Sequence, residues 1–143
     1  MDVFWAKGYE HASMADLTRA MGINSPSLYA AFGSKEALFK EAVKLYVETE
    51  GGGIWDRVET MPTAREAVEH VLRASARAFT QGKPRGCLIV LAAPQSEGST
   101  AAVCEELKSR RAENVTILET RLERAVAEGE LPQGADCHGI AQY

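Results

Sequence analysis

The sequence predicts an all-α fold, in which a three-helix, helix-turn-helix head precedes a second helical domain. Between Ser13 and Lys35, side-chain capping residues and a glycine mark two short helices joined by a tight turn. Beyond residue 53, apolar residues recur at the three- and four-residue spacing that gives a helix one buried side. These two observations place the head at residues 1–50 and the second domain at residues 51–143.

The first helix of the helix-turn-helix begins at Ser13, whose hydroxyl can accept a hydrogen bond from a free backbone N–H. Asp16 follows at the spacing of a capping box. Gly22 is expected to end the helix, because glycine accepts the left-handed backbone found just past a helix end. The apolar side of this helix is formed by Met14, Leu17 and Met21.

The second helix follows the glycine turn and is the candidate for insertion into the major groove of DNA. Asn24 or Ser25 can cap it, and Pro26 stands in its first turn, where a missing N–H costs nothing. Leu28 and Phe32 are one helical turn apart and are expected to point back at the first helix. The opposite side should therefore face solvent.

The outward side of this second helix is small and nearly uncharged, because Pro26 and Ala30 occupy its centre. It contains no Arg or Lys that could make a bidentate contact with guanine. We expect close approach, thymine-methyl contacts and hydroxyl-to-phosphate hydrogen bonds, with Lys35 adding a positive charge beside free backbone N–H groups. The candidate DNA-binding residues are Ser13, Arg19, Asn24, Ser25, Pro26, Ser27, Tyr29, Ala30 and Lys35.

The stretch KGYEHASMADLTRAMGINSPSLYAAFGSKEALF, residues 7–39, resembles the DNA-binding domain of TetR/AcrR-type transcriptional regulators. The matching features are Gly8-Tyr9, Ser13, Gly22-Ile23, Ser27-Leu28-Tyr29, Phe32 and the run from Lys35 to Phe39. The resemblance implies a ligand-responsive repressor that binds double-stranded operator DNA as a homodimer in the cytoplasm. It also implies a fragment that lacks the start of the first helix and the last dimerisation helices.

The rest of the head reads as two further helices. Residues 1–7 form the end of a helix that stops at Gly8, and residues 34–50 form a longer helix capped by Ser34. The resemblance implies that this longer helix links the head to the ligand domain. Gly51-Gly52-Gly53 ends it and marks the domain boundary, either as a hinge or as a simple loop. The apolar side of the linking helix consists of Leu38, Ala42, Leu45 and Tyr46.

The second domain is expected to contain several helices. A short one covers residues 54–61, and Thr63 with Glu66 opens another that reaches residue 81. Residues 85–94 are the most apolar stretch, which periodicity alone cannot assign, and the helical surroundings favour a buried helix. Ser99 or Thr100 opens a long helix to Glu128, a loop covers residues 129–134, and a further helix begins at Ala135.

Two apolar stripes define the expected core of this domain. In the helix after Thr63, His70 projects opposite a stripe formed by Val68, Val71, Leu72, Ser75 and Phe79. In the long helix, the core-facing residues are Val103, Leu107, Val115, Leu118, Leu122 and Val126.

The resemblance implies that a small-molecule effector binds between helices of the second domain and tilts the linking helix. Trp55 and Phe79 are the strongest candidates for the lining of this site, because aromatic faces suit apolar ligands. The expected ligands include apolar or aromatic cations and acids. For each of these side chains taken alone, core packing is favoured over contact with a ligand. The candidate pocket residues are Trp55, Val58, Met61, Val71, Ser75, Phe79, Cys87 and Leu88.

Composition and charge limit the other classes of protein to which the chain could belong. The net charge is −4, and residues 1–50 carry seven acidic and five basic side chains, so DNA affinity must come from local placement of charge and helix ends. The longest apolar run, residues 87–94, is far shorter than the roughly 20 residues that cross a bilayer. Cys87, Cys104 and Cys137 lack metal-ligand spacing, so no metal or cofactor is expected. An odd number of cysteines without a secretion signal suits a reducing cytoplasm.

Three alternatives remain beside the regulator. An enzyme could use Cys87 as its nucleophile, but His70 lies opposite the apolar stripe of its helix, so the prediction is that the chain is not an enzyme. A thiol-based, redox-sensing regulator could use Cys87 with Cys104. A helical adaptor that binds protein would fit the acidic balance but leaves the outward side of residues 25–32 unexplained.

Overall fold

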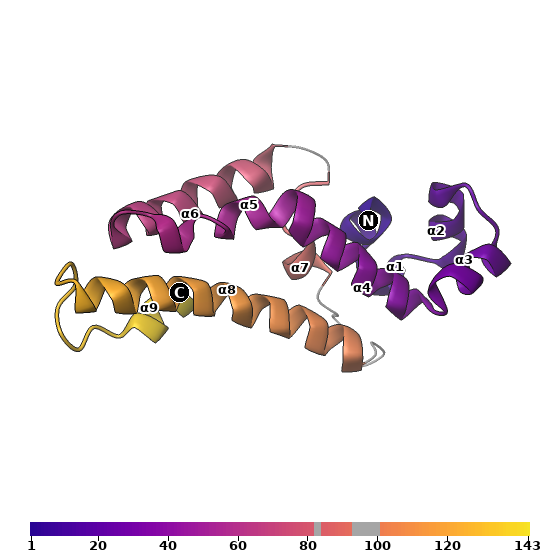
Figure 1. Ribbon diagram of the computed structural model, residues 1–143. Helices are drawn as coiled ribbons and strands as arrows, with labels where there is room; N and C mark the ends of the chain where they lie inside the picture. Colours follow the sequence, from indigo (N-terminus) through magenta and orange to yellow (C-terminus); the bar gives the residue numbers. More distant parts are fainter. Residues whose placement is uncertain (82–83, 93–100) are drawn as a thin grey trace.

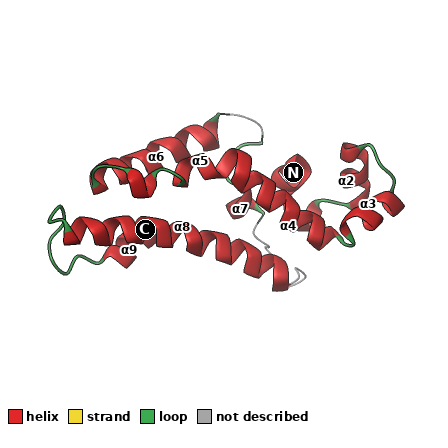
Figure 2. Ribbon diagram, viewed as in Figure 1, coloured by secondary structure: helices red, strands yellow, loops and turns green. Residues whose placement is uncertain are grey.

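The computed structural model of the protein describes residues 1–81, 84–92 and 101–143. Every regular element within these ranges is helical, which confirms the all-α fold (Figure 2). The expected helix end at Pro94 and the expected caps at Ser99 or Thr100 lie outside the described residues.

The head consists of three helices, α1 (Asp2–His11), α2 (Met14–Met21) and α3 (Ser25–Phe32), together with the linking helix α4 (Lys35–Tyr46). The caps predicted for α2 are confirmed, since Ser13 and Asp16 form a capping box and Gly22 adopts the left-handed conformation with φ of 68°. The expected end of the first helical segment at Gly8 is also found. Gly8 has a non-helical backbone, with φ of 74° and ψ of 169°, so α1 consists of two helical segments that meet at this break, the second of which ends at His11.

An aromatic core holds the head together. The Phe4 ring in α1 meets the Phe39 ring in α4 edge to face, with 5.1 Å between ring centroids, and the Tyr9 ring also lies 5.1 Å from that of Phe39. Leu17 and Leu28 bring α2 and α3 onto this core. Because α4 turns Phe39 inward, its buried side is rotated from the expected one.

In α2 and α4, few side chains differ in burial from what the spacing of apolar residues predicts. Leu45 was expected to be buried in α4, but it is 47% exposed, and Val43 is fully buried instead. Met21, at the end of α2, is 42% exposed. In both helices the core lies slightly to one side of the stripe that the spacing alone predicts.

The three glycines at residues 51–53 form neither the hinge nor the loop expected there. α4 passes into a π-helical turn (Val47–Gly51) and then directly into α5 (Gly52–Trp55). A Cβ on Gly52 would lie 2.5 Å from the Val47 carbonyl oxygen, and one on Gly51 would lie 3.0 Å from the Tyr46 ring. Glycine is required here by close packing, and the linking helix is continuous with the second domain.

The second domain continues with a short 3-10 helix (Val58–Thr60), α6 (Ala64–Thr80), α7 (Leu88–Leu91), α8 (Ala101–Ala127) and α9 (Cys137–Gln142). Thr63 caps α6 as predicted, accepting a hydrogen bond from the Glu66 backbone N–H at 3.2 Å. α7 is a single turn, much shorter than the helix expected over residues 85–94, and its Val90 and Leu91 are exposed.

Figure 1 shows how these helices are arranged. α2 and α3 lie at one end of an elongated molecule, and α4 leads from them to α5 and α6. α8 runs along the opposite side, with α7 between it and α4 and α9 packed against it. One core joins the head to α7 and the start of α8, and a second core joins α6, α8 and α9.

α6 faces its neighbours through small residues. Ala64 and Ala67 are buried, whereas Leu72, expected in the apolar stripe, is 65% exposed. His70, expected to project away from the core, instead has its Nε2 atom shielded from solvent with no hydrogen-bond partner among the described residues. Val68 and Val71 of the expected stripe still pack against the core of α6, α8 and α9, so Leu72 is the member of that stripe that the structure leaves exposed.

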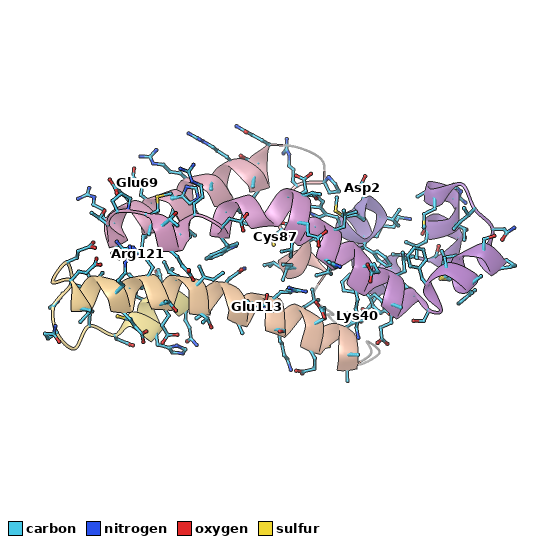
Figure 3. The ribbon with its side chains drawn as sticks, viewed as in Figure 1. Asp2, Lys40, Glu69, Cys87, Glu113 and Arg121 are labelled. Atoms are coloured by element: carbon cyan, nitrogen blue, oxygen red, sulfur yellow. The ribbon has the colours of Figure 1, made fainter. Side chains whose placement is uncertain are left out.

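Arg121 is a buried charge that holds the turn before α6 against α8. Its guanidinium donates to the Met61 and Pro62 carbonyls at 3.2 and 3.0 Å and pairs with Glu130 at 3.0 Å. Figure 3 shows the Arg121 side chain between α8 and that turn. The Ala64 backbone N–H and then Arg121 lower the pKa of the Glu130 carboxyl. These bonds close the end of the molecule farthest from the head.

Candidate nucleic-acid interface and ligand cavity

α3 is held at both ends by local hydrogen bonds. The Asn24 side-chain oxygen accepts from the Ser27 backbone N–H at 2.8 Å, so Asn24 rather than Ser25 is the N-cap. Gly33 ends the helix with φ of 76°, and its N–H donates to the Tyr29 carbonyl at 2.8 Å. Leu28 is fully buried and fixes which side of α3 faces the head core.

The other side of α3 projects into solvent. Asn24, Ser25, Pro26, Ser27, Tyr29 and Ala30 are all exposed. Tyr29 is 49% exposed, so its ring stands out from the helix. α2 packs behind α3, and the outward side carries no charged residue. A slim and neutral helix of this kind can approach DNA bases closely.

Ser13 and Arg19 lie beside this surface, in or next to α2, and both are exposed. The Ser13 hydroxyl donates to the Asp16 carboxylate at 2.7 Å, and Lys7 of α1 pairs with the same carboxylate at 2.8 Å. Lys7, and then Ser13, lower the pKa of Asp16 to about 2. The Arg19 guanidinium lies 3.8 Å from the Asp16 carboxylate, and the Arg19 side chain is 80% exposed.

Lys35 turns back onto the head. Its ammonium lies 4.6 Å from the centre of the Tyr9 ring and donates to the Glu10 backbone carbonyl at 3.4 Å. Burial lowers the pKa of Lys35, and the nearby Glu10 carboxylate partly opposes that shift. The ammonium therefore also holds the end of α1, a role that its position at the start of a helix does not reveal.

The second domain contains a cavity of about 590 Å³, within the range of small-molecule sites. Its walls come from the end of α4, the π-helical turn, α5, α6, α7, α8 and α9. Of the candidate pocket residues, Trp55, Val71, Ser75, Phe79 and Cys87 line it. The side chains that sequence spacing did not single out include Tyr46, Val47, Ile54, Ile89, Asn114 and Leu118.

Three candidate pocket residues do not line this cavity. Leu88 is fully buried in the core shared by the head, α7 and α8, because α7 is one short turn that points it away from the cavity. Val58 is fully buried in the core of α6, α8 and α9, and Met61 packs against that core. Val58 lies in the 3-10 helix that follows α5, and Met61 comes directly after that helix.

The cavity wall is attached to the head at α7. Tyr46, at the end of α4, is buried, and this burial together with a hydrogen bond to the Cys87 thiol raises the pKa of its phenol. The Tyr46 ring packs edge to face on Trp5 of α1, with 5.0 Å between centroids. Cys87 lies near the middle of the molecule in Figure 3. Residues at one corner of the cavity thus contact both α1 and α4.

The alternatives proposed from the sequence find little support in this geometry. No histidine is among the described lining of the cavity that contains Cys87. Cys104 does not line that cavity, and Cys137 is buried in the other core. Across the described residues, no helix has the length and apolar character to span a bilayer. Nor, in those residues, do three or more His, Cys, Asp or Glu side chains gather as a metal site.

A helix-turn-helix with a projecting second helix, joined to a helical domain with a largely apolar cavity, is an arrangement typical of transcriptional regulators. Comparison with known families agrees. Residues 1–42 match the model described as "Bacterial regulatory proteins, tetR family", and residues 61–143 match that of the "Tetracyclin repressor-like, C-terminal domain". The chain belongs to the TetR family of transcriptional regulators.

Several relatives support this assignment. The HTH-type transcriptional repressor ComR of Escherichia coli K12 is 31% identical over 153 residues, covering all of this chain and 69% of ComR. The repressor BdcR of the same organism is 39% identical over 89 residues, covering 62% of this chain and 45% of BdcR. A cysteine mutant of the TetR family regulator CifR, solved with 26-bp double-strand operator DNA, is 44% identical with a TM-score of 0.92, covering 99% of this chain and 74% of CifR.

Proposed function

We propose that this protein is a cytoplasmic repressor that binds operator DNA through the outward side of α3 and releases it when a small molecule occupies the cavity. The observation that carries the DNA-binding part is the exposure of Pro26 and Ala30 while Leu28 on the same helix is fully buried. The similarity to the repressors ComR and BdcR, and to CifR bound to operator DNA, supports it.

The proposed DNA contacts divide into two kinds. Pro26 and Ala30 approach base edges, where small apolar groups fit against thymine methyl groups. Ser25, Ser27 and Tyr29 donate hydroxyls to phosphates, with Asn24 at the helix start. Ser13, Arg19 and Lys35 add contacts along the phosphate backbone, which position the head without reading sequence.

The DNA-binding role is tested by selecting binding sites from random duplex DNA and comparing Ala30→Arg with the parent chain. An arginine at Ala30 could contact guanine, so the selected site is expected to change at one position in each half. Ala76→Arg is the matched control, because Ala76 is exposed on α6, outside the helix-turn-helix. Selection of the parent site by Ala30→Arg would remove Ala30 from the DNA contact.

The proposed homodimer follows from the geometry of DNA. One α3 reads only a few base pairs, and two heads must reach successive major grooves about 34 Å apart to read a longer site. The selected site is therefore expected to be an inverted repeat with half-sites about one helical turn apart. A single unrepeated half-site, together with a 1:1 complex in sedimentation for a chain that also carries the dimerisation helices, would contradict the dimer.

The proposed release of DNA uses the attachment of the cavity to the head. Tyr46 and Val47 line the cavity and belong to the continuous helical run that carries α4 into the head. A ligand shifts the balance only if it binds the form with low DNA affinity more tightly than the other. Occupancy that displaces the end of α4 or α7 would move α3 relative to its DNA position.

A further inference from the structure

We infer that the cavity selects an uncharged, mainly apolar small molecule that carries a single hydroxyl or carbonyl group. This inference rests on the proposed function, because it names the chemistry of the effector of the same cavity. The sequence alone allowed aromatic cations and acids as well. The lining revealed by the structure distinguishes between these classes.

The described residues that line the cavity have no charged side chain. The Tyr46 phenol, whose pKa is raised by burial, stays protonated and neutral. A carboxylate or an ammonium entering the cavity would lose its hydration without gaining an opposite charge, which is costly. The lining therefore disfavours ionised ligands of either sign.

Two polar side chains of the cavity wall are available to a ligand. Ser75 of α6 and Asn114 of α8 both line the cavity, and neither side chain has a hydrogen-bond partner among the described residues. Gln142, by contrast, already contacts the His138 ring at 2.8 Å. A hydroxyl can accept from the Asn114 amide and donate to its oxygen, and a carbonyl can accept from either residue. One such group on the ligand would satisfy these side chains.

Most of the remaining cavity wall is apolar. Trp55 of α5 and Phe79 of α6 both line the cavity and are only partly buried. Val71 and Leu118 add aliphatic surface. The aromatic faces and a volume of about 590 Å³ suit a ring system of one or two fused rings with space to spare. The inferred ligand is thus an aromatic or alicyclic alcohol, ketone or ester.

The test uses three probes of nearly equal shape: 2-naphthylmethanol, 2-naphthoate and 2-naphthylmethylammonium. Their affinities for the full chain are measured by isothermal titration calorimetry at pH 7.5, where the second is an anion and the third a cation. The neutral alcohol is expected to bind at least about ten-fold more tightly than either ion. An ion that binds as tightly as the alcohol, or no binding of any probe at about 1 mM, would overturn the inference.

Three variants at Ser75 and Asn114 connect the preference to the cavity. Ser75→Ala and Asn114→Leu are each expected to weaken binding of the alcohol by about three- to ten-fold through a lost hydrogen bond. Asn114→Asp should reverse the preference, favouring 2-naphthylmethylammonium over the alcohol. Ser109→Ala is the matched control, because Ser109 lies on α8 outside this cavity. An Asn114→Asp variant with unchanged preference would place the probe elsewhere and contradict the inference.

These outcomes are separable from those of the proposed function. Calorimetry of the chain without DNA measures the cavity alone, whereas site selection measures α3 alone. Equal binding of the ions with intact DNA recognition would refute only the ligand class. A preference for the alcohol without any DNA recognition would refute the repressor and leave the ligand class standing.

Discussion

The indole N–H of Trp5 donates a hydrogen bond to the backbone carbonyl of Gly86 at 3.2 Å, joining α1 of the head to the segment that leads into α7. The two residues are 81 positions apart in the sequence. Gly86 adjoins Cys87, a residue of the cavity wall. The head and the ligand domain therefore share a direct contact besides the continuous helical run from α4 to α5.

Replacing Trp5 by phenylalanine removes the donor and keeps an aromatic ring near Tyr46. We expect the free energy of unfolding to fall by about 1–2 kcal/mol, from the lost hydrogen bond and the smaller ring. Amide hydrogen exchange should accelerate in α7. Exchange in α9, which does not touch Trp5, serves as the internal control. Unchanged exchange in α7 would show that this hydrogen bond does not hold the segment.

Lys35→Met tests whether the ammonium contacts DNA as well as the end of α1. Methionine keeps the packing of the stem on Tyr9 and removes the charge. Affinity is expected to fall about five-fold for every DNA sequence, and the slope of log K against log salt should become less steep by about one. Lys108→Met on α8 is the control. An unchanged salt slope for Lys35→Met would confine Lys35 to packing within the head.

Gly52→Ala and Gly53→Ala form a matched pair at the π-helical turn. The added methyl group at Gly52 would lie 2.5 Å from the Val47 carbonyl oxygen, whereas at Gly53 nothing lies within 4 Å. Chemical denaturation should show a loss of about 1–3 kcal/mol for Gly52→Ala and a gain of about 0.5–1 kcal/mol for Gly53→Ala. Equal effects of the two changes would mean that the turn is not packed as described.

The pKa of Asp16 reports the junction of α1 and α2. Because Lys7 is the largest cause of its lowering to about 2, Lys7→Met should raise that pKa toward the ordinary value of 3.8. Lys40→Met, whose partner is Glu36, should leave it unchanged. The pKa of Asp16 is measured directly from its carboxyl chemical shift in an NMR titration.

The sign of the pH dependence follows from that lowered pKa. A carboxyl group whose pKa falls on folding stabilises the fold above its unfolded value and loses this contribution as the pH falls through its folded value. The parent chain should therefore lose more stability than Lys7→Met between pH 4 and pH 2. Parallel stability curves for the two proteins over this window would contradict the assigned contact.

Local signals in the sequence predicted much of the head. Capping at Ser13 and Ser34, and the glycine at position 22, depend on neighbouring residues only, so short-range rules suffice. The burial of Leu28 with exposure of Pro26 and Ala30 followed from helical spacing. These residues define the candidate DNA surface, which is why the family could be recognised there.

Packing, within the π-helical turn and between distant segments, accounts for what sequence reasoning missed. A run of three glycines ordinarily signals a break, but here the close approach of the Tyr46 ring and the Val47 carbonyl favours glycine within a helix. The Lys35 ammonium reaches α1, 25 positions away in the sequence. Asn114 lines the cavity from α8 because of how α8 lies across α6, and no local pattern distinguishes it from a surface asparagine.

The most direct test of the account is to replace each thymine of the selected operator by uracil, which removes only the methyl group in the major groove. An uncharged α3 that reads DNA through Pro26 and Ala30 predicts that one or more thymines in each half-site lose about 1 kcal/mol of binding on this change. If every uracil-substituted operator binds with the same affinity as the operator with thymine, α3 does not lie against the thymine methyl groups.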